Sequence, residues 1–288
     1  MSKELAVISP GAVLAQYGPM RLTIQAWTED GPSTDLAAKA GEFSFSLLPR
    51  LIPARDLFRR EKFPFETSAD EPMLKTMIQA IKHIGLKELG PMAAVAGTVA
   101  ETVNLYLKDL GAVKSIVENG GDLSIYLTPE QSANVGVRLG VDDPAPSYRL
   151  KLSGIVRPLW GVASSGLGGR SLTMGIADTA LCLAASAPVA DAAATAVANY
   201  CLVETPAVKR VLAENIDPET DIRGLWVTES VGGLSDQEIE SALTRAVQYA
   251  QYLTDKNILL GAVISLRGRV VMTRDFDQMA APFEPMES

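Results

Sequence analysis

The order of strand-like and helix-like segments along the chain limits its fold more than any other feature. Runs in which apolar and polar residues alternate predict strands, and apolar residues spaced three and four apart predict helices. The two kinds are interspersed without the regular alternation of a doubly wound parallel sheet, so we predict an α+β fold. The expected strands are residues 12–17, 21–29, 113–118, 123–127, 135–141, 148–156, 179–185, 225–230, 258–266 and 269–273, and the expected helices lie around 35–40, over 73–86, 92–111 and 235–253, and in the Ala-rich segment before residue 200.

The clearest local signal is the turn Asn119-Gly120-Gly121-Asp122. Apolar runs flank it on both sides, and Asn-Gly between two such runs is typical of a tight β-hairpin. Taken alone, this segment indicates a turn rather than a binding site.

The composition is that of an ordinary globular protein. Of 288 residues, 47% are hydrophobic and 21% are charged, and the formal net charge is −8. An acidic chain is a poor partner for nucleic acid or an anionic membrane, although a local loop can still bind the phosphate of a small molecule. No signal peptide is recognisable, and the most apolar stretch, 172–203, is interrupted by charged residues and proline. We expect a cytoplasmic protein with no membrane span.

The cysteines and the single histidine restrict the chemistry further. Cys182 and Cys201 lie in apolar surroundings and are expected to be buried, reduced thiols. His83, near a helix end, is expected to be solvated or to cap that helix. With one histidine and two cysteines, a structural zinc site and a Ser-His-Asp hydrolase are both disfavoured.

Residues 161–200 contain the strongest candidate for a metal site. Asp191 and Thr195 are four residues apart in the Ala-rich helix, so their oxygens project from one face. A carboxylate and a hydroxyl in this arrangement suit a hard cation such as Mg²⁺. The alternative is structural, because an Asp in the first turn complements the helix dipole and a helical Thr often bonds to an upstream carbonyl.

Two glycine-containing segments add to this picture. The loop Ser164-Ser165-Gly166 with Gly168-Gly169-Arg170 could present amides, hydroxyls and a guanidinium to phosphate, although most such loops are only loops. It lacks the spacing of a P-loop or a dinucleotide fingerprint. Gly97 inside an Ala-rich helix costs about 1 kcal/mol relative to Ala, which indicates close approach of another backbone.

Three segments together resemble the ApbE-like superfamily. They are GPMAAVAGTVAETV (90–103), VENGGDLSIYL (117–127) and the stretch 161–200. That superfamily contains the flavin transferases, which move FMN from FAD onto a protein Thr or Ser using Mg²⁺. The chain looks most similar to a cytoplasmic branch found in anaerobes and archaea, and the resemblance covers roughly residues 20–230.

The resemblance implies a fold and a set of site residues. It implies one ApbE-like (T-fold-like) domain over residues 1–288, with mixed and largely antiparallel sheets packed with helices, completed by 231–288. The metal would be held by Asp191 and Thr195 with a backbone carbonyl near Val95. Residues matching the family's flavin-site motifs are Gly97, Glu101, Gly120, Gly121, Asp122, Ser164, Ser165 and Gly166.

One departure from the family pattern bears on the activity. The transferases carry a His followed by D-P-R-T-G shortly before the last strand and the metal helix, and here that place reads GGRSLTMGIADT. The family's Lys in the A-K-G-Y motif is also absent. The first hypothesis is therefore a protein that binds a flavin nucleotide (FAD or FMN), or a related phosphorylated ligand, with Mg²⁺ and lacks standard FMN-transferase activity.

Two alternatives stay open. The chain is an active FAD:protein FMN transferase, or it is an accessory protein in the incorporation of sulfide into homocysteine, as the branch it resembles implies. In that role its partner would be a ferredoxin-like or sulfur-transfer protein. A homodimer is one candidate assembly in each case.

Overall fold

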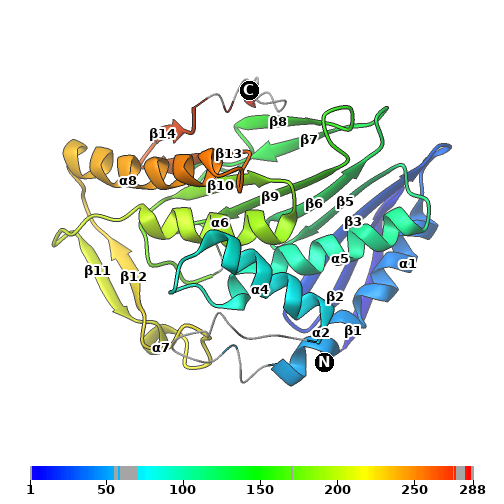
Figure 1. Cartoon of the computed structure of the whole chain (residues 1–288), viewed down its shortest axis with the longest axis horizontal. Coiled ribbons are helices and arrows are strands. Elements are labelled where there is room, and N and C mark those ends of the chain that lie inside the picture. Colours follow the sequence, from blue (N-terminus) through cyan, green and yellow to red (C-terminus); the bar gives the residue numbers. More distant parts are fainter. Residues whose placement is uncertain are drawn as a thin grey trace.

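The computed structural model describes residues 2–54, 58, 70–169, 171–274, 276 and 283–286. Helices cover one face of a large antiparallel sheet, and a smaller sheet covers part of its other face (Figure 1). The predicted α+β class with largely antiparallel sheets is confirmed.

The large sheet has ten strands, and every neighbouring pair is antiparallel. Its order is β1-β2-β3-β5-β6-β9-β10-β13-β14, with β4 paired to β3. The strands are β1 (Lys3–Ser9), β2 (Ala12–Tyr17), β3 (Met20–Thr28), β4 (Gly31–Pro32), β5 (Lys114–Asn119), β6 (Asp122–Leu127), β9 (Leu159–Ser165), β10 (Thr179–Ala184), β13 (Gly261–Leu266) and β14 (Arg269–Met272).

The helices bury their apolar sides against one face of this sheet (Figure 1). Inward-facing residues of the strands, such as Leu22 and Ile24, are fully buried beneath them. The helices are α1 (Thr34–Ser44), α2 (Leu47–Leu51), η1 (Ile52–Ala54), α4 (Pro72–Ile84), η2 (Pro91–Ala94), α5 (Val95–Asp109), α6 (Ala187–Tyr200), α7 (Ala213–Ile216) and α8 (Asp236–Asp255). Among the described residues, no helix is both long and apolar enough to cross a membrane.

The second sheet makes a separate core on the opposite face. It consists of β7 (Ser132–Val137), β8 (Tyr148–Ser153) and β15 (Phe283–Pro285), in the order β15-β8-β7. The alternating burial of β7 points Val135 and Val137 at the large sheet, where they pack with Trp160 and Leu181. A separate hairpin, β11 (Val208–Leu212) with β12 (Trp226–Val231), lies to one side (Figure 1).

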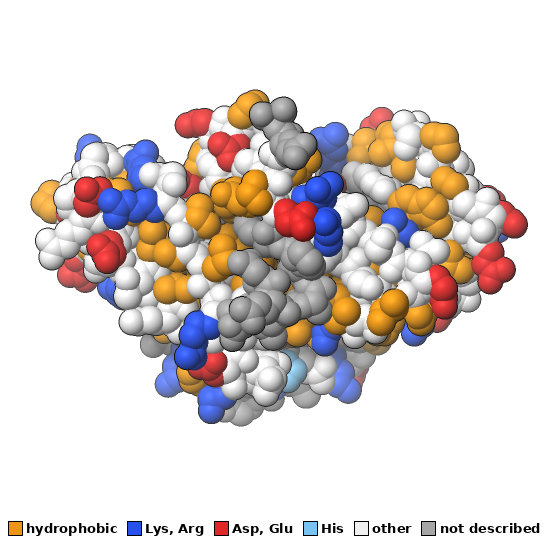
Figure 2. Space-filling model, turned by 90° about the horizontal axis from the view of Figure 1, so that it is seen from above, with side chains coloured by type: hydrophobic (Ala, Val, Ile, Leu, Met, Phe, Trp, Pro, Cys, Tyr) orange, Lys and Arg blue, Asp and Glu red, His pale blue; other side chains and the backbone are white. Residues whose placement is uncertain are grey.

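Charge is mixed on the surface. On the face shown in Figure 2, Lys and Arg side chains lie among Asp and Glu side chains. This face therefore presents charge of both signs. Charges are also paired between β8 and β15, where Glu284 lies 2.8 Å from Lys151 Nζ and 3.7 Å from an Arg149 nitrogen.

A buried polar group fixes α5 against the sheet. The Asn104 amide donates to Ser124 Oγ at 3.0 Å, and its oxygen accepts from the Ser115 hydroxyl. All three side chains are fully buried. Because buried polar groups are costly unless paired, this network favours one placement of α5 over β5 and β6.

Most predicted elements are present, with three informative differences. The hairpin at 119–122 is confirmed, and β2 has the predicted bounds. The predicted helix 92–111 is divided into the 3₁₀ turn η2 and the α-helix α5. Ser164 and Ser165, expected in a loop, end strand β9, and β1 was missed because its side chains are mostly exposed.

Candidate functional site

A cavity of about 980 Å³ lies at the turn end of the β5–β6 hairpin and extends between the two sheets. Strand, turn and helix residues distant in sequence line it. They include Met20, Arg21, Leu48, Leu51, Met92, Val95, Val99, Glu118, Asn119, Gly120, Gly121, Asp122, Arg138, Ser164, Ser165, Gly166, Ser171, Asp178, Asp191 and Thr195.

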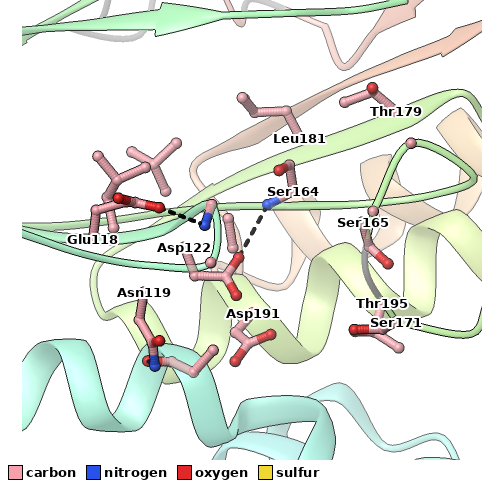
Figure 3. A pocket seen from close by; sticks show the side chains of 18 of the residues that line it. Glu118, Asn119, Asp122, Ser164, Ser165, Ser171, Thr179, Leu181, Asp191 and Thr195 are labelled. Carbon is pink, nitrogen blue, oxygen red and sulfur yellow. Dashed lines mark hydrogen bonds between the residues drawn. The ribbon is translucent and has the colours of Figure 1, made fainter. Parts of the chain in front are cut away.

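The Gly120-Gly121 turn forms one wall. Both glycines have positive φ, 69° and 108°, which residues with a Cβ rarely adopt. The Glu118 carboxylate accepts the Gly121 N–H at 2.9 Å, and Asp122 Oδ1 accepts the Ser164 N–H at 3.3 Å (Figure 3). These two bonds fix the turn and join it to the end of β9.

Asp122 and Asp191 form the most polar part of the cavity. Figure 3 shows their carboxylates lying near one another, and each residue is only 9% exposed. Burial raises the pKa of Asp191 well above its ordinary value, and the neighbouring Asp122 charge raises it further, while amide bonds from Gly97 and Ala96 lower it. Two buried carboxylates in this position repel each other unless a proton or a cation lies between them.

The rest of the lining divides into a polar and an apolar part. Thr195 lies one turn after Asp191 on α6, and Ser164 and Ser165 come from the end of β9. Apolar side chains from the start of β3, from α2 and from η2 line another part of the wall: Met20, Leu48, Leu51 and Met92. A ligand with an apolar ring and a charged, oxygen-rich end matches such a lining.

Three candidate residues lie at the junction of α5 and α6. Val95 lines the cavity, but as the first residue of α5 its carbonyl points along the helix toward the Val99 amide. Gly97 donates its N–H to Asp191 Oδ2 at 2.9 Å. Glu101 lies outside the cavity lining, where its Oε2 accepts the Ala187 N–H at 2.7 Å.

The close backbone approach predicted at Gly97 is present. A Cβ on this residue would lie 2.3 Å from the Ala187 carbonyl oxygen. The predicted state of the cysteines is also found, since Cys182 and Cys201 are free and fully buried.

Sequence analysis missed part of the lining. Glu118 and Asn119 adjoin the recognised turn and could have been included with it. Asp178, whose carboxylate accepts the Arg267 N–H at 2.5 Å, also lines the cavity. Arg138 and the apolar wall carry no local signal, because only tertiary packing brings them to the cavity. Arg170, the predicted phosphate-binding guanidinium, lies outside the described residues.

The donor set suits a hard cation only in part. Within the described part of the chain, no three His, Cys, Asp or Glu side chains form a metal-binding group. The available oxygens are the Asp122 and Asp191 carboxylates and the Thr195 hydroxyl. Mg²⁺ commonly takes one or two protein carboxylates and completes its shell with water and substrate phosphates, so these residues fit a cation that arrives with a phosphorylated ligand.

Comparison with known proteins gives a match to a family model and matches to individual archaeal proteins. Residues 6–272 match the family model described as AbpE bacteria. A UPF0280 protein of Methanoregula boonei is 34% identical over 204 residues, which are 69% of this chain and 80% of that protein. A UPF0280 protein of Methanocaldococcus jannaschii is 31% identical over 226 residues, 76% of this chain and 84% of that protein.

A solved structure has the same fold. The apo form of the flavinyl transferase ApbE of Pseudomonas stutzeri matches with a TM-score of 0.54 and 12% identity, over 97% of this chain and 98% of that one. At this identity, the likeness extends to the fold alone.

Proposed function

The chain belongs to the AbpE bacteria family, and from this membership we propose that its cavity binds a flavin nucleotide, or a related phosphorylated ligand, together with Mg²⁺. The observation that carries the proposal is the pair of buried carboxylates, Asp122 and Asp191, that lie near one another in the cavity. Thr195 adds a hydroxyl oxygen on the same helix as Asp191.

The excess of negative charge among the described lining residues favours a ligand that binds together with a cation. Among the described lining residues, Glu118, Asp122, Asp178 and Asp191 are acidic, whereas Arg21 and Arg138 are basic. A bare phosphate would meet more negative than positive charge here. A divalent cation between the carboxylates and the phosphates removes that repulsion, and when bound it supplies charge neutralisation.

The lining also supports the ring of such a ligand. Leu48, Leu51 and Met92 line the cavity along with the carboxylates, and the sulfur of Met packs favourably with aromatic rings. A flavin nucleotide combines a planar ring with phosphate, which matches both parts of the wall.

Isothermal titration tests the proposal. We expect FAD or FMN to bind when Mg²⁺ is present and to bind much more weakly in EDTA. Asp191→Asn keeps an oxygen that can accept the Gly97 N–H but removes the charge, so its Mg²⁺-dependent affinity should fall at least about tenfold. The control is Asp236→Asn, which removes an exposed surface carboxylate paired with Arg269. No binding of either flavin in either condition contradicts the proposal.

We propose binding without FMN transfer because of the segment 168–179, GGRSLTMGIADT. It holds neither the His nor the D-P-R-T-G sequence that the resemblance associates with FMN transfer. The alternative of an active transferase predicts that incubation with FAD, Mg²⁺ and an acceptor protein adds the mass of FMN to the acceptor. We expect no such mass shift, and its appearance would replace the binding proposal with the transferase.

The accessory role in sulfide incorporation receives no support from the thiols. Cys182 and Cys201 are fully buried, and burial raises the pKa of both, that of Cys201 to about 12. A thiol that stays protonated and inaccessible is a poor sulfur carrier. A role of this kind would therefore depend on a partner's chemistry.

A further inference from the structure

The first turns of α5 and α6 both lack a cap of their own. Ala94 and Ser186 occupy the N-cap positions, and neither makes a side-chain capping bond. The first amides of a helix have no partner within the helix and must be satisfied from outside. Pro188 in the first turn of α6 removes one of these donors, and the Ala187 N–H is one of those that still need an acceptor.

Each helix supplies the missing cap of the other. Glu101 on α5 accepts the Ala187 N–H of α6 at 2.7 Å, and Asp191 on α6 accepts the Gly97 N–H of α5 at 2.9 Å. In both helices the carboxylate follows the donating amide by four residues, from 97 to 101 and from 187 to 191. The two bonds therefore form one reciprocal exchange between the helices.

The contact leaves little room for adjustment. A Cβ on Gly97 would lie 2.3 Å from the Ala187 oxygen and 3.0 Å from Asp191 Cβ. On the other side of α6, a Cβ on Gly161 of β9 would lie 2.5 Å from the Ala187 nitrogen. The start of α6 is thus held between α5 and the sheet, and Ala187 is in contact with both.

A charged Glu101 side chain is energetically unfavourable at this buried position. Burial raises its pKa to about 7, and the bond from Ala187 offsets only part of that effect. A neutral glutamine could accept the same N–H without the cost of a buried charge. Groups whose ionisation is disfavoured by their surroundings are concentrated at functional sites.

We propose that Glu101 is a positioning residue that, by capping α6, holds Asp191 and Thr195 in the orientation in which they face the cavity. The role of Asp191 and Thr195 as cation ligands rests on the function proposed above. The cap itself does not, so the two can be tested separately.

The first test needs no metal or nucleotide. In assigned, isotope-labelled protein, the amide signals of Ala187 and Gly97 report the two caps. Glu101→Ala should move the Ala187 signal and also the Gly97 signal, because the loss of one cap displaces Asp191 from the other. Glu101→Gln should restore the Gly97 signal, because the glutamine oxygen can accept the Ala187 N–H.

The second test measures affinity for Mn²⁺, as a probe of the Mg²⁺ site, in the presence of FAD. Binding is followed by the loss of the electron paramagnetic resonance signal of the free ion. We expect Glu101→Ala to weaken Mn²⁺ binding about 10- to 100-fold and Glu101→Gln to recover most of it. The matched control is Ser235→Ala, which removes an ordinary N-cap bond at the start of α8. It should leave Mn²⁺ affinity unchanged.

The outcomes separate the two proposals. If Glu101→Ala moves the Ala187 signal but leaves Gly97 and Mn²⁺ affinity unchanged, the cap is local and the positioning role is wrong. Equal losses for the Ala and Gln variants, or for Ser235→Ala, would also overturn it. If the wild-type protein binds no Mn²⁺ yet the Gly97 signal responds as expected, the positioning role stands and the proposed function fails.

Discussion

At the scale of single residues, Asp191 is central to the proposed site. Its carboxylate accepts the Gly97 N–H and lies near that of Asp122. A negative charge at such a buried position lowers the stability of the folded protein.

Asp191→Asn should therefore make the protein more stable and less able to bind. Burial and Asp122 raise the pKa of Asp191, so at neutral pH its negative charge is disfavoured in the folded state. Removing that charge should increase the free energy of unfolding, while Mg²⁺-dependent flavin affinity falls at least about tenfold. Urea denaturation at neutral pH checks the first expectation. A variant less stable than the wild type would show that the charge is already compensated.

Glu101→Gln should give a pH-dependent gain in stability. The pKa of Glu101 is raised from 4.5 in the unfolded chain to about 7 in the folded protein. The folded state thus binds the proton more tightly, and stability falls as pH rises from about 4.5 to 7. The variant should equal the wild type near pH 4 and exceed it above pH 7 by up to about 3 kcal/mol. A difference in unfolding free energy between variant and wild type that does not change with pH contradicts this explanation.

The sequence is informative about single residues where the signal is local. Asp191 and Thr195 stand out by their helical spacing, and Gly120-Gly121 by its turn chemistry, and all four line the cavity. Glu101 is different, because its contact is with the first amide of a helix 86 residues later. Nothing near it in sequence identifies that amide.

At the scale of elements, the close approach of α5 and α6 positions the site residues of both helices. Gly97→Ala should push the helices apart, since its Cβ would lie 2.3 Å from the Ala187 oxygen. We expect a loss of roughly 1–3 kcal/mol of stability, together with weaker flavin binding. Thermal or urea unfolding measures the loss.

Gly90→Ala is the matched control for that substitution. Gly90 has φ −86°, and a Cβ there would meet no atom within 4 Å. It should be neutral or slightly stabilising, because the new side chain restricts only the unfolded chain. Equal losses at both positions would show that helix approach is not the cause.

Elements are predictable from the sequence to the extent that their periodicity is local. β2 and the β5–β6 hairpin follow from alternation and Asn-Gly chemistry. β9 was missed because it is buried along most of its length and runs into Ser and Gly, so it shows no alternation. At the break between η2 and α5, both elements pack against α6, a tertiary contact that a propensity argument does not contain.

At the scale of the whole molecule, the cavity is assembled from both halves of the chain. The β3–β5–β6 part contributes the turn and Asp122, and α6 contributes Asp191 and Thr195. The strand order could not be derived from the sequence. β6 pairs with β9, although β7 and β8, which belong to the second sheet, lie between them along the chain. That pairing places Ser164 beside Asp122.

The central claim is that a cation lies between Asp122 and Asp191 when the ligand is bound. The most direct measurement is anomalous diffraction from crystals of the protein grown with Mn²⁺ and FAD. We predict an anomalous peak in contact with Asp191, at a metal–oxygen distance of about 2–2.5 Å, with the phosphates on its other side. Bound FAD with no peak beside Asp191, or with the peak elsewhere, contradicts the account.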